Sequence, residues 1–142
     1  MKISARADYA CKAVLELSLH WPKEEPLPIN IIAQKQNIPI RFLTHILLSL
    51  KQLGLVQSSR GKAGGYVLLQ SPKDIHLSQI ILHFSEWTSH KSPQMGARKP
   101  INVFNIIWKE FDETMLQFLE KITFEDLLER NRDLENVPMF VI

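Results

Sequence analysis

Apolar residues recur at spacings of three and four from residue 4 to about residue 20, and neither glycine nor proline interrupts them. This period is that of an amphipathic α-helix, so the pattern predicts a first helix over this stretch. Ser4 belongs to the residue types that cap the amino end of a helix. The pair Trp21-Pro22 ends the predicted helix, because the residue before a proline is biased away from helical backbone angles.

The helical period returns in two further segments separated by a tight turn. A helix of about eight residues is expected to open next to Pro28, and Asn37 tolerates the left-handed conformation that ends it. Its apolar face is made of Ile29, Ile32 and Ala33. The helix after it ends at Gly54, and its apolar positions are Phe42, Leu43, Ile46, Leu47, Leu50 and Leu53. The pattern therefore predicts a helix-turn-helix unit.

The period then changes to that of strands. Residues 55–59 and 66–69 are two short runs on either side of a glycine-rich segment, residues 60–65 with the sequence RGKAGG. Short strand-like runs joined by such a segment predict a β-hairpin with a glycine-rich tip.

Two more short helices are expected. One lies near residues 77–86, where leucine, isoleucine and phenylalanine recur at helical spacing. The other runs from Phe124 to about Arg130, and Thr123 with Asp126 three residues on resembles a capping box at its start. Between the hairpin and the end of the chain, residues 88–100 are polar and broken by glycine and proline, which is typical of a loop.

A long helix is predicted from Asn102 to about Ile122, because its apolar residues alternate between spacings of four and three. These residues form the heptad stripe: Phe104, Trp108, Phe111, Met115, Phe118 and Ile122. Other apolar residues widen it: Ile101, Val103, Ile107, Leu116 and Leu119. So small a protein offers too little surface to cover this helix, which favours a second copy of the chain. The alternative, a helix lying wholly against its own domain, stays open.

A chain of 142 residues has room for one domain with an appended element. The predicted fold class is mainly α with a small β-hairpin, in the order of a winged helix-turn-helix domain followed by a long dimerisation helix. We expect the DNA-binding domain over residues 1–87, a loop over 88–100, and the dimerisation helix with a short C-terminal helix over 101–142.

Composition removes several functional classes. The single cysteine, Cys11, cannot form an intramolecular disulfide or furnish the thiolates of a zinc or iron-sulfur site, and its spacing suits a small core residue. No apolar stretch approaches the roughly 20 residues that span a bilayer, and the amino terminus lacks a signal-like pattern, so we expect a cytoplasmic protein without a membrane partner. No P-loop, nucleophile-elbow, metalloprotease or dinucleotide pattern is present, so we expect no enzyme.

Charge is divided unevenly along the chain. Residues 1–73 carry ten Lys and Arg against four Asp and Glu, whereas residues 74–142 carry seven against eleven. A basic half beside an acidic half is typical of a protein that turns one part towards a polyanion. The winged helix-turn-helix order agrees, because its second helix enters the major groove and its hairpin tip approaches the DNA backbone or minor groove. Double-stranded DNA is therefore the expected partner.

Candidate DNA contacts follow from these placements. The base readers are the residues between apolar positions of the third helix: Arg41, Thr44, His45 and Ser49. Residues suited to phosphate contacts are Lys2, Arg6, Tyr9 and Lys51. The wing supplies Arg60, Gly61, Lys62 and Tyr66. Glycine lets the tip come close to DNA, and arginine on a narrow wing can enter an A·T-rich minor groove.

Three stretches together resemble the Rrf-two family of bacterial winged-helix regulators. They are residues 1–10 (MKISARADYA), residues 42–56, which end in LKQLGLV, and the wing at residues 60–66 (RGKAGGY). The resemblance implies a transcriptional regulator, usually a repressor, that forms a homodimer through the long helix and binds a palindromic operator. Its two recognition helices are then expected in successive major grooves about 34 Å apart.

The chain departs from that family in its loop. Many members hold an iron-sulfur cluster on three cysteines before the long helix, and residues 88–100 contain none. We therefore expect no cluster, no metal and no other cofactor, and interpret His83 and His90 as surface or packing residues. Thr44 stands where an iron-sulfur member carries an acidic base reader, so a different operator is expected.

A second function stays open, that of a winged-helix module that senses an effector or acts through a partner protein. The basic wing and the outward positions of Arg41 and His45 favour DNA, since a purely protein-binding module has no need of them.

Overall fold

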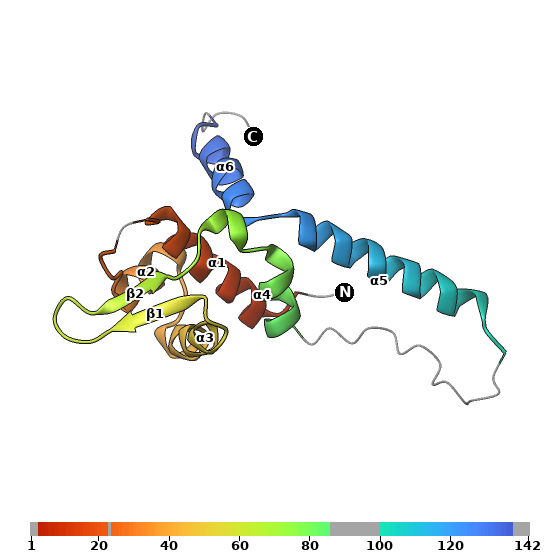
Figure 1. Cartoon of the computed structure of the whole chain (residues 1–142), viewed down its shortest axis with the longest axis horizontal. Helices are drawn as coiled ribbons and strands as arrows, with labels where there is room; N and C mark the ends of the chain where they lie inside the picture. The colour runs from red at the N-terminus through yellow and green to blue at the C-terminus, as the bar shows by residue number, and fades with distance from the viewer. Residues whose placement is uncertain (1–2, 23, 86–99, 138–142) are drawn as a thin grey trace.

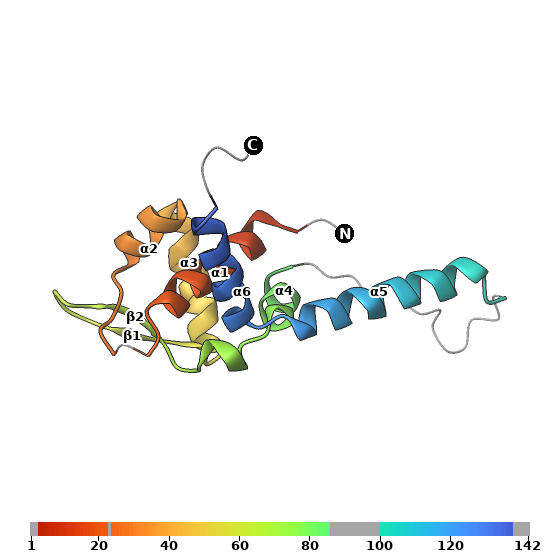
Figure 2. The same ribbon diagram turned by 90° about the horizontal axis from the view of Figure 1, so that it is seen from above.

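A computed structural model describes residues 3–22, 24–85 and 100–137 of the chain. Its first helix, α1 (Ala5–Leu19), begins as predicted at Ser4, whose Oγ accepts a hydrogen bond from the Ala7 backbone N–H at 3.1 Å. The helix ends just before Trp21-Pro22, whose peptide bond is cis. Helix α1 lies among the other helices of the winged-helix body, where it packs against α2, α3, α4 and α6 (Figures 1 and 2).

The predicted helix-turn-helix is present as α2 (Ile29–Gln36) and α3 (Ile40–Gln52). Asn37 ends α2 in the left-handed conformation with φ of 53°, as expected from its side chain. On its inner side, α3 buries four aliphatic residues that are at most 1% exposed: Leu43, Ile46, Leu47 and Leu50. These residues fix α3 against α1 and leave its other side outward.

The hairpin consists of β1 (Val56–Ser59) and β2 (Gly65–Leu68), paired antiparallel with Val56 opposite Leu68. Leu27 adds a short bridge to β2 by exchanging two backbone hydrogen bonds of 2.9 Å with Tyr66. Gly65 is required at this crossing, because a Cβ there would collide with the Leu27 backbone carbonyl. The base of the wing is thereby tied to the loop before α2.

Two helices follow the hairpin within the described residues up to 85. A single 3₁₀ turn, η1 (Pro72–Asp74), was not predicted, whereas α4 (Leu77–Phe84) was expected and ends two residues earlier than the pattern suggested. The long helix α5 (Val103–Lys121) is capped by Asn102, as its predicted start requires. It projects from the body on the side opposite the hairpin (Figure 1).

The last helix, α6 (Phe124–Glu135), is five residues longer than predicted. The expected capping box is present, with the Asp126 backbone N–H donating to Thr123 Oγ1 at 3.1 Å and the Thr123 N–H donating to the Asp126 carboxylate at 3.0 Å. These bonds lower the pKa of Asp126 below its usual range. Phe124 is 0% exposed within the core that α1 and α3 share, so α6 packs onto the winged-helix unit and does not continue α5.

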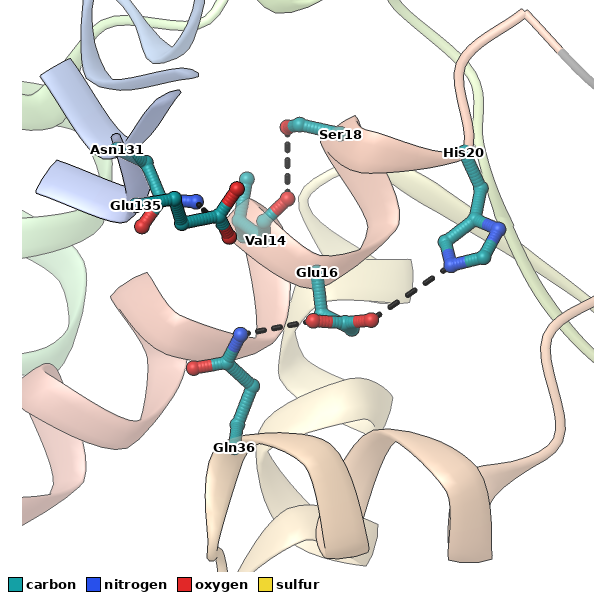
Figure 3. Close-up of polar contacts among 7 residues, drawn as sticks. All are labelled: Val14, Glu16, Ser18, His20, Gln36, Asn131 and Glu135. Carbon is teal, nitrogen blue, oxygen red and sulfur yellow. Dashed lines mark hydrogen bonds and ion pairs between the residues drawn. The ribbon is translucent and has the colours of Figure 1, made fainter. Parts of the chain in front are cut away.

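A buried carboxylate links α1 to α2 and was not foreseen. Glu16 lies on the inner side of α1 and is 3% exposed. Its Oε2 accepts a hydrogen bond from Gln36 Nε2 at 2.8 Å, and its Oε1 lies 3.6 Å from His20 Nε2 (Figure 3). These two partners compensate part of the cost of burying the charge, so Glu16 fixes the end of α2 against α1.

Candidate nucleic-acid interface

The outward side of α3 presents the predicted base readers. Arg41, Thr44 and His45 are exposed and Ser49 is half-buried. Thr44 Oγ1 donates to the Ile40 carbonyl at 2.9 Å, which orients the side chain along the helix. An α-helix that is packed on its inner side and presents these side chains outward has the dimensions to enter a major groove.

Two residues that were assigned to the apolar side of the third helix are exposed: Leu53, the C-cap, is 40% exposed, and Phe42 lies in the first turn. Phe42 was assigned to the apolar side and is 44% exposed. Its ring lies 6.0 Å from the ring of Tyr9 on α1, and the Arg41 guanidinium carbon lies 4.8 Å from its centroid. The Phe42 ring thus contacts two predicted DNA-contacting residues, Tyr9 and Arg41. The period alone could not show this, because the contact of Phe42 with Tyr9 depends on how α1 and α3 pack together.

Two predicted phosphate contacts are held against neighbouring elements. Arg6 Nη2 donates to Ser49 Oγ at 3.4 Å, and the Arg6 guanidinium carbon lies 5.2 Å from the centroid of the Phe84 ring. Lys51 Nζ donates to Ser58 Oγ on β1 at 3.0 Å. Arg6 therefore lies beside α3 and Lys51 lies at its carboxyl end, whereas the predicted contact Lys2 lies outside the described residues.

The wing carries exposed cations at its tip. Arg60, Gly61 and Lys62 are exposed, and Gly61 has φ of +105°, a conformation that suits glycine. The turn is closed by the Gly64 N–H, which donates to the Gly61 carbonyl at 2.9 Å. Tyr66 lies farther back and is half-buried against the core, so of the four predicted wing residues it is the one farthest into the protein.

The heptad stripe on α5 is mostly uncovered. Its exposed aromatic members are Phe104 (59%), Trp108 (44%), Phe111 (42%) and Phe118 (58%). Met115 is half-buried. Ile122 differs from the prediction, because it is only 7% exposed, and its carbonyl accepts from the Leu77 N–H at 2.8 Å. The end of α5 is thus docked on α4, and Ile122 belongs to the interior of one chain and not to an exposed seam.

The predicted inert cysteine is half-buried in α1, where it packs against the core. Burial, and after it the charge of Asp8, raises the pKa of the Cys11 thiol to about 12. His83 packs edge-on against the Phe84 ring at 4.8 Å, while His90 lies outside the described residues. Over residues 3–22, 24–85 and 100–137, no three His, Cys, Asp or Glu side chains gather where they could hold a metal ion. Within the same ranges no helix is long and apolar enough to cross a membrane.

Comparison with known proteins decides the family. The family model Rrf2, described as an iron-dependent transcriptional regulator, matches residues 3–130. The chain belongs to the Rrf2 family. A Synechocystis protein assigned as an HTH-type transcriptional regulator, slr0846, is 34% identical over 130 residues, which are 89% of this chain and 87% of that protein. The regulator IscR of Pectobacterium atrosepticum is 29% identical over 143 residues, covering 96% of this chain and 84% of that protein.

Solved structures of Rrf2 regulators share the fold. IscR of T. potens superposes with a TM-score of 0.80 at 25% identity, covering 99% of this chain and 95% of that one. CymR of B. subtilis, named as a global cysteine regulator, gives a TM-score of 0.79 at 28% identity, covering 92% and 98%. The family consists of transcriptional regulators and not of enzymes, so this Rrf2 protein is a DNA-binding transcriptional regulator, as predicted. Because Cys11 is its only cysteine, a site of three cysteine ligands cannot form within one chain.

Proposed function

We propose that this Rrf2 regulator is a repressor that binds a palindromic operator as a homodimer and does so without an iron-sulfur cluster. The observation that carries the proposal is the row of exposed aromatic residues on α5, at the end of the molecule opposite the wing (Figure 1). Several large aromatic residues exposed together on one helix are typical of a subunit interface. Pairing two copies along α5 duplicates the DNA-binding face, and a symmetric protein reads a palindrome.

Within each half-site, we assign the bases to the outward side of α3 and the phosphates to α1 and the wing. The side chains that carry this assignment are Arg6, Tyr9, Arg41, Thr44, His45, Ser49, Lys51, Arg60 and Lys62. Two contacts made by neighbouring groups support it, namely Arg41 on the Phe42 ring and Arg6 on Ser49. Both order long cationic side chains before DNA arrives, which lowers the entropy that binding would otherwise cost.

Two experiments test this proposal. Binding of the purified protein to a duplex with both half-sites is compared with binding to a duplex in which one half-site is scrambled; a homodimer loses most of its affinity, whereas a monomer binds both alike. In the organism of origin, promoters occupied by the protein are mapped and their transcripts are measured after deletion of the gene. If the protein is a repressor, those transcripts should rise after the deletion. A fall would refute the repressor assignment.

A further inference from the structure

Leu48 is an exposed leucine on a helix whose apolar side is already complete. It is 53% exposed, although its neighbour Leu47 and the next inward residue, Leu50, are both 0% exposed. The core beneath α3 therefore does not use Leu48. The exposed half of this aliphatic side chain contributes nothing to the core, and it is free to contact a partner on the outward side of α3.

The surroundings of Leu48 identify that partner. Since α-helical residues at spacings of four and three share a face, Leu48 lies in one row with Arg41 and His45. Arg41 stands at the amino end of this row, and Lys51 lies one turn from Leu48 on the same helix. The leucine is thus flanked by cationic and polar side chains, a setting that complements DNA and not the apolar patch of a protein.

We propose that Leu48 reads the 5-methyl group of a thymine in the major groove. This inference rests on the proposed function, because it takes α3 as the helix that enters the groove. The methyl group of thymine is the apolar feature that base pairs present there, and apolar side chains recognise it by contact. Leu48 then confers sequence specificity without a hydrogen bond, beside the polar readers of the same row.

The geometry of the row also places the thymine. Leu48 follows Arg41 by seven positions, and at about 1.5 Å per residue the two lie roughly 10 Å apart along the helix axis. Base pairs are stacked about 3.4 Å apart. A helix lying along the groove therefore sets the thymine about three base pairs from the base that Arg41 contacts.

The test removes single methyl groups from the DNA. In the tightest duplex selected by the wild-type protein, each thymine is replaced in turn by deoxyuridine, which lacks only the 5-methyl group. We expect wild-type affinity to fall about fourfold at one thymine of each half-site, the value for one buried methyl group. That thymine should lie about three base pairs from the position at which Arg41→Ala abolishes the base preference.

The protein variants complete the test. Leu48→Ala should bind the thymine duplex more weakly than the wild type and bind thymine and deoxyuridine equally well at that position. Leu69→Ala is the matched control, because Leu69 is 49% exposed but lies at the base of the hairpin; it should discriminate as the wild type does. Circular dichroism confirms that both variants fold.

Two results would overturn the assignment of Leu48: a wild-type protein for which no thymine methyl matters, or a Leu48→Ala variant that still discriminates fully. In either case the selected palindrome would remain, and the proposed function would stand. A wild-type protein that selects no sequence would instead remove the proposed function and this inference together.

Discussion

Replacing Phe111 by glutamate should convert the proposed dimer to monomers. Phe111 lies in the middle of the heptad stripe and is 42% exposed in one chain. A phenylalanine residue offers on the order of 200 Å² of surface, so roughly 85 Å² per protomer remains for a partner to cover. At about 25 cal/mol per Å², that area contributes about 2 kcal/mol per protomer and ~4 kcal/mol per dimer.

Removing this contribution weakens the dimer about a thousandfold, since ~1.4 kcal/mol corresponds to a factor of ten. The glutamate adds a further penalty, because a carboxylate without a partner would be buried at the seam. We therefore expect Phe111→Glu to be monomeric at micromolar concentrations at which the wild type is dimeric.

Sedimentation equilibrium over a range of protein concentrations measures this directly. Gln117→Glu is the matched control, because Gln117 is exposed on the opposite side of α5 from the stripe and the substitution adds the same charge; it should remain dimeric. Near-wild-type circular dichroism shows that the winged-helix unit is intact. A Phe111→Glu protein with the wild-type dimer constant would place the interface elsewhere and refute the reasoning.

Three further outcomes are expected. Replacing Arg60 and Lys62 together by alanine should reduce the slope of log affinity against log salt by about 0.9 for each phosphate group that the variant no longer neutralises. The control Lys73→Ala should leave the slope unchanged. A wild-type slope in the double variant would show that the wing does not contact the DNA. Glu16→Ala should lower the free energy of unfolding in urea by about 2 kcal/mol, since it leaves buried hydrogen-bonding groups unpaired; a wild-type unfolding midpoint would contradict this. Because burial raises the pKa of Cys11 to about 12, the folded protein at pH 8 should react with iodoacetamide far more slowly than the urea-unfolded chain, and equal rates would show that the thiol is accessible.

Local signals in the sequence predicted most of the elements. Ser4 caps the start of α1 with its side chain, and Asn37 ends α2 in the left-handed conformation. Both effects are local and do not depend on the rest of the fold. The long spacing pattern of α5 predicted its length almost to the residue. The family resemblance was likewise correct, because the Rrf2 family model matches residues 3–130.

The residues that escaped prediction depend on contacts between distant elements. Glu16 looks like a solvated charge until Gln36 and His20 are brought beside it. Phe42 looks like a core residue until the edge of α1 places Tyr9 next to its ring. Ile122 fits the heptad spacing, but the docking of α5 on α4 buries it in its own chain. Spacing gives the face of a helix, whereas tertiary packing decides what covers it.

Selection of bound sequences from random duplex DNA, carried out at two salt concentrations, tests the central claim most directly. A homodimer that presents two copies of α3 and two cationic wings predicts enrichment of a palindrome whose half-site centres are about 34 Å, or one helical turn, apart. Affinity for it should fall steeply as salt rises. Enrichment of no sequence, or of a single unrepeated half-site, would contradict the account.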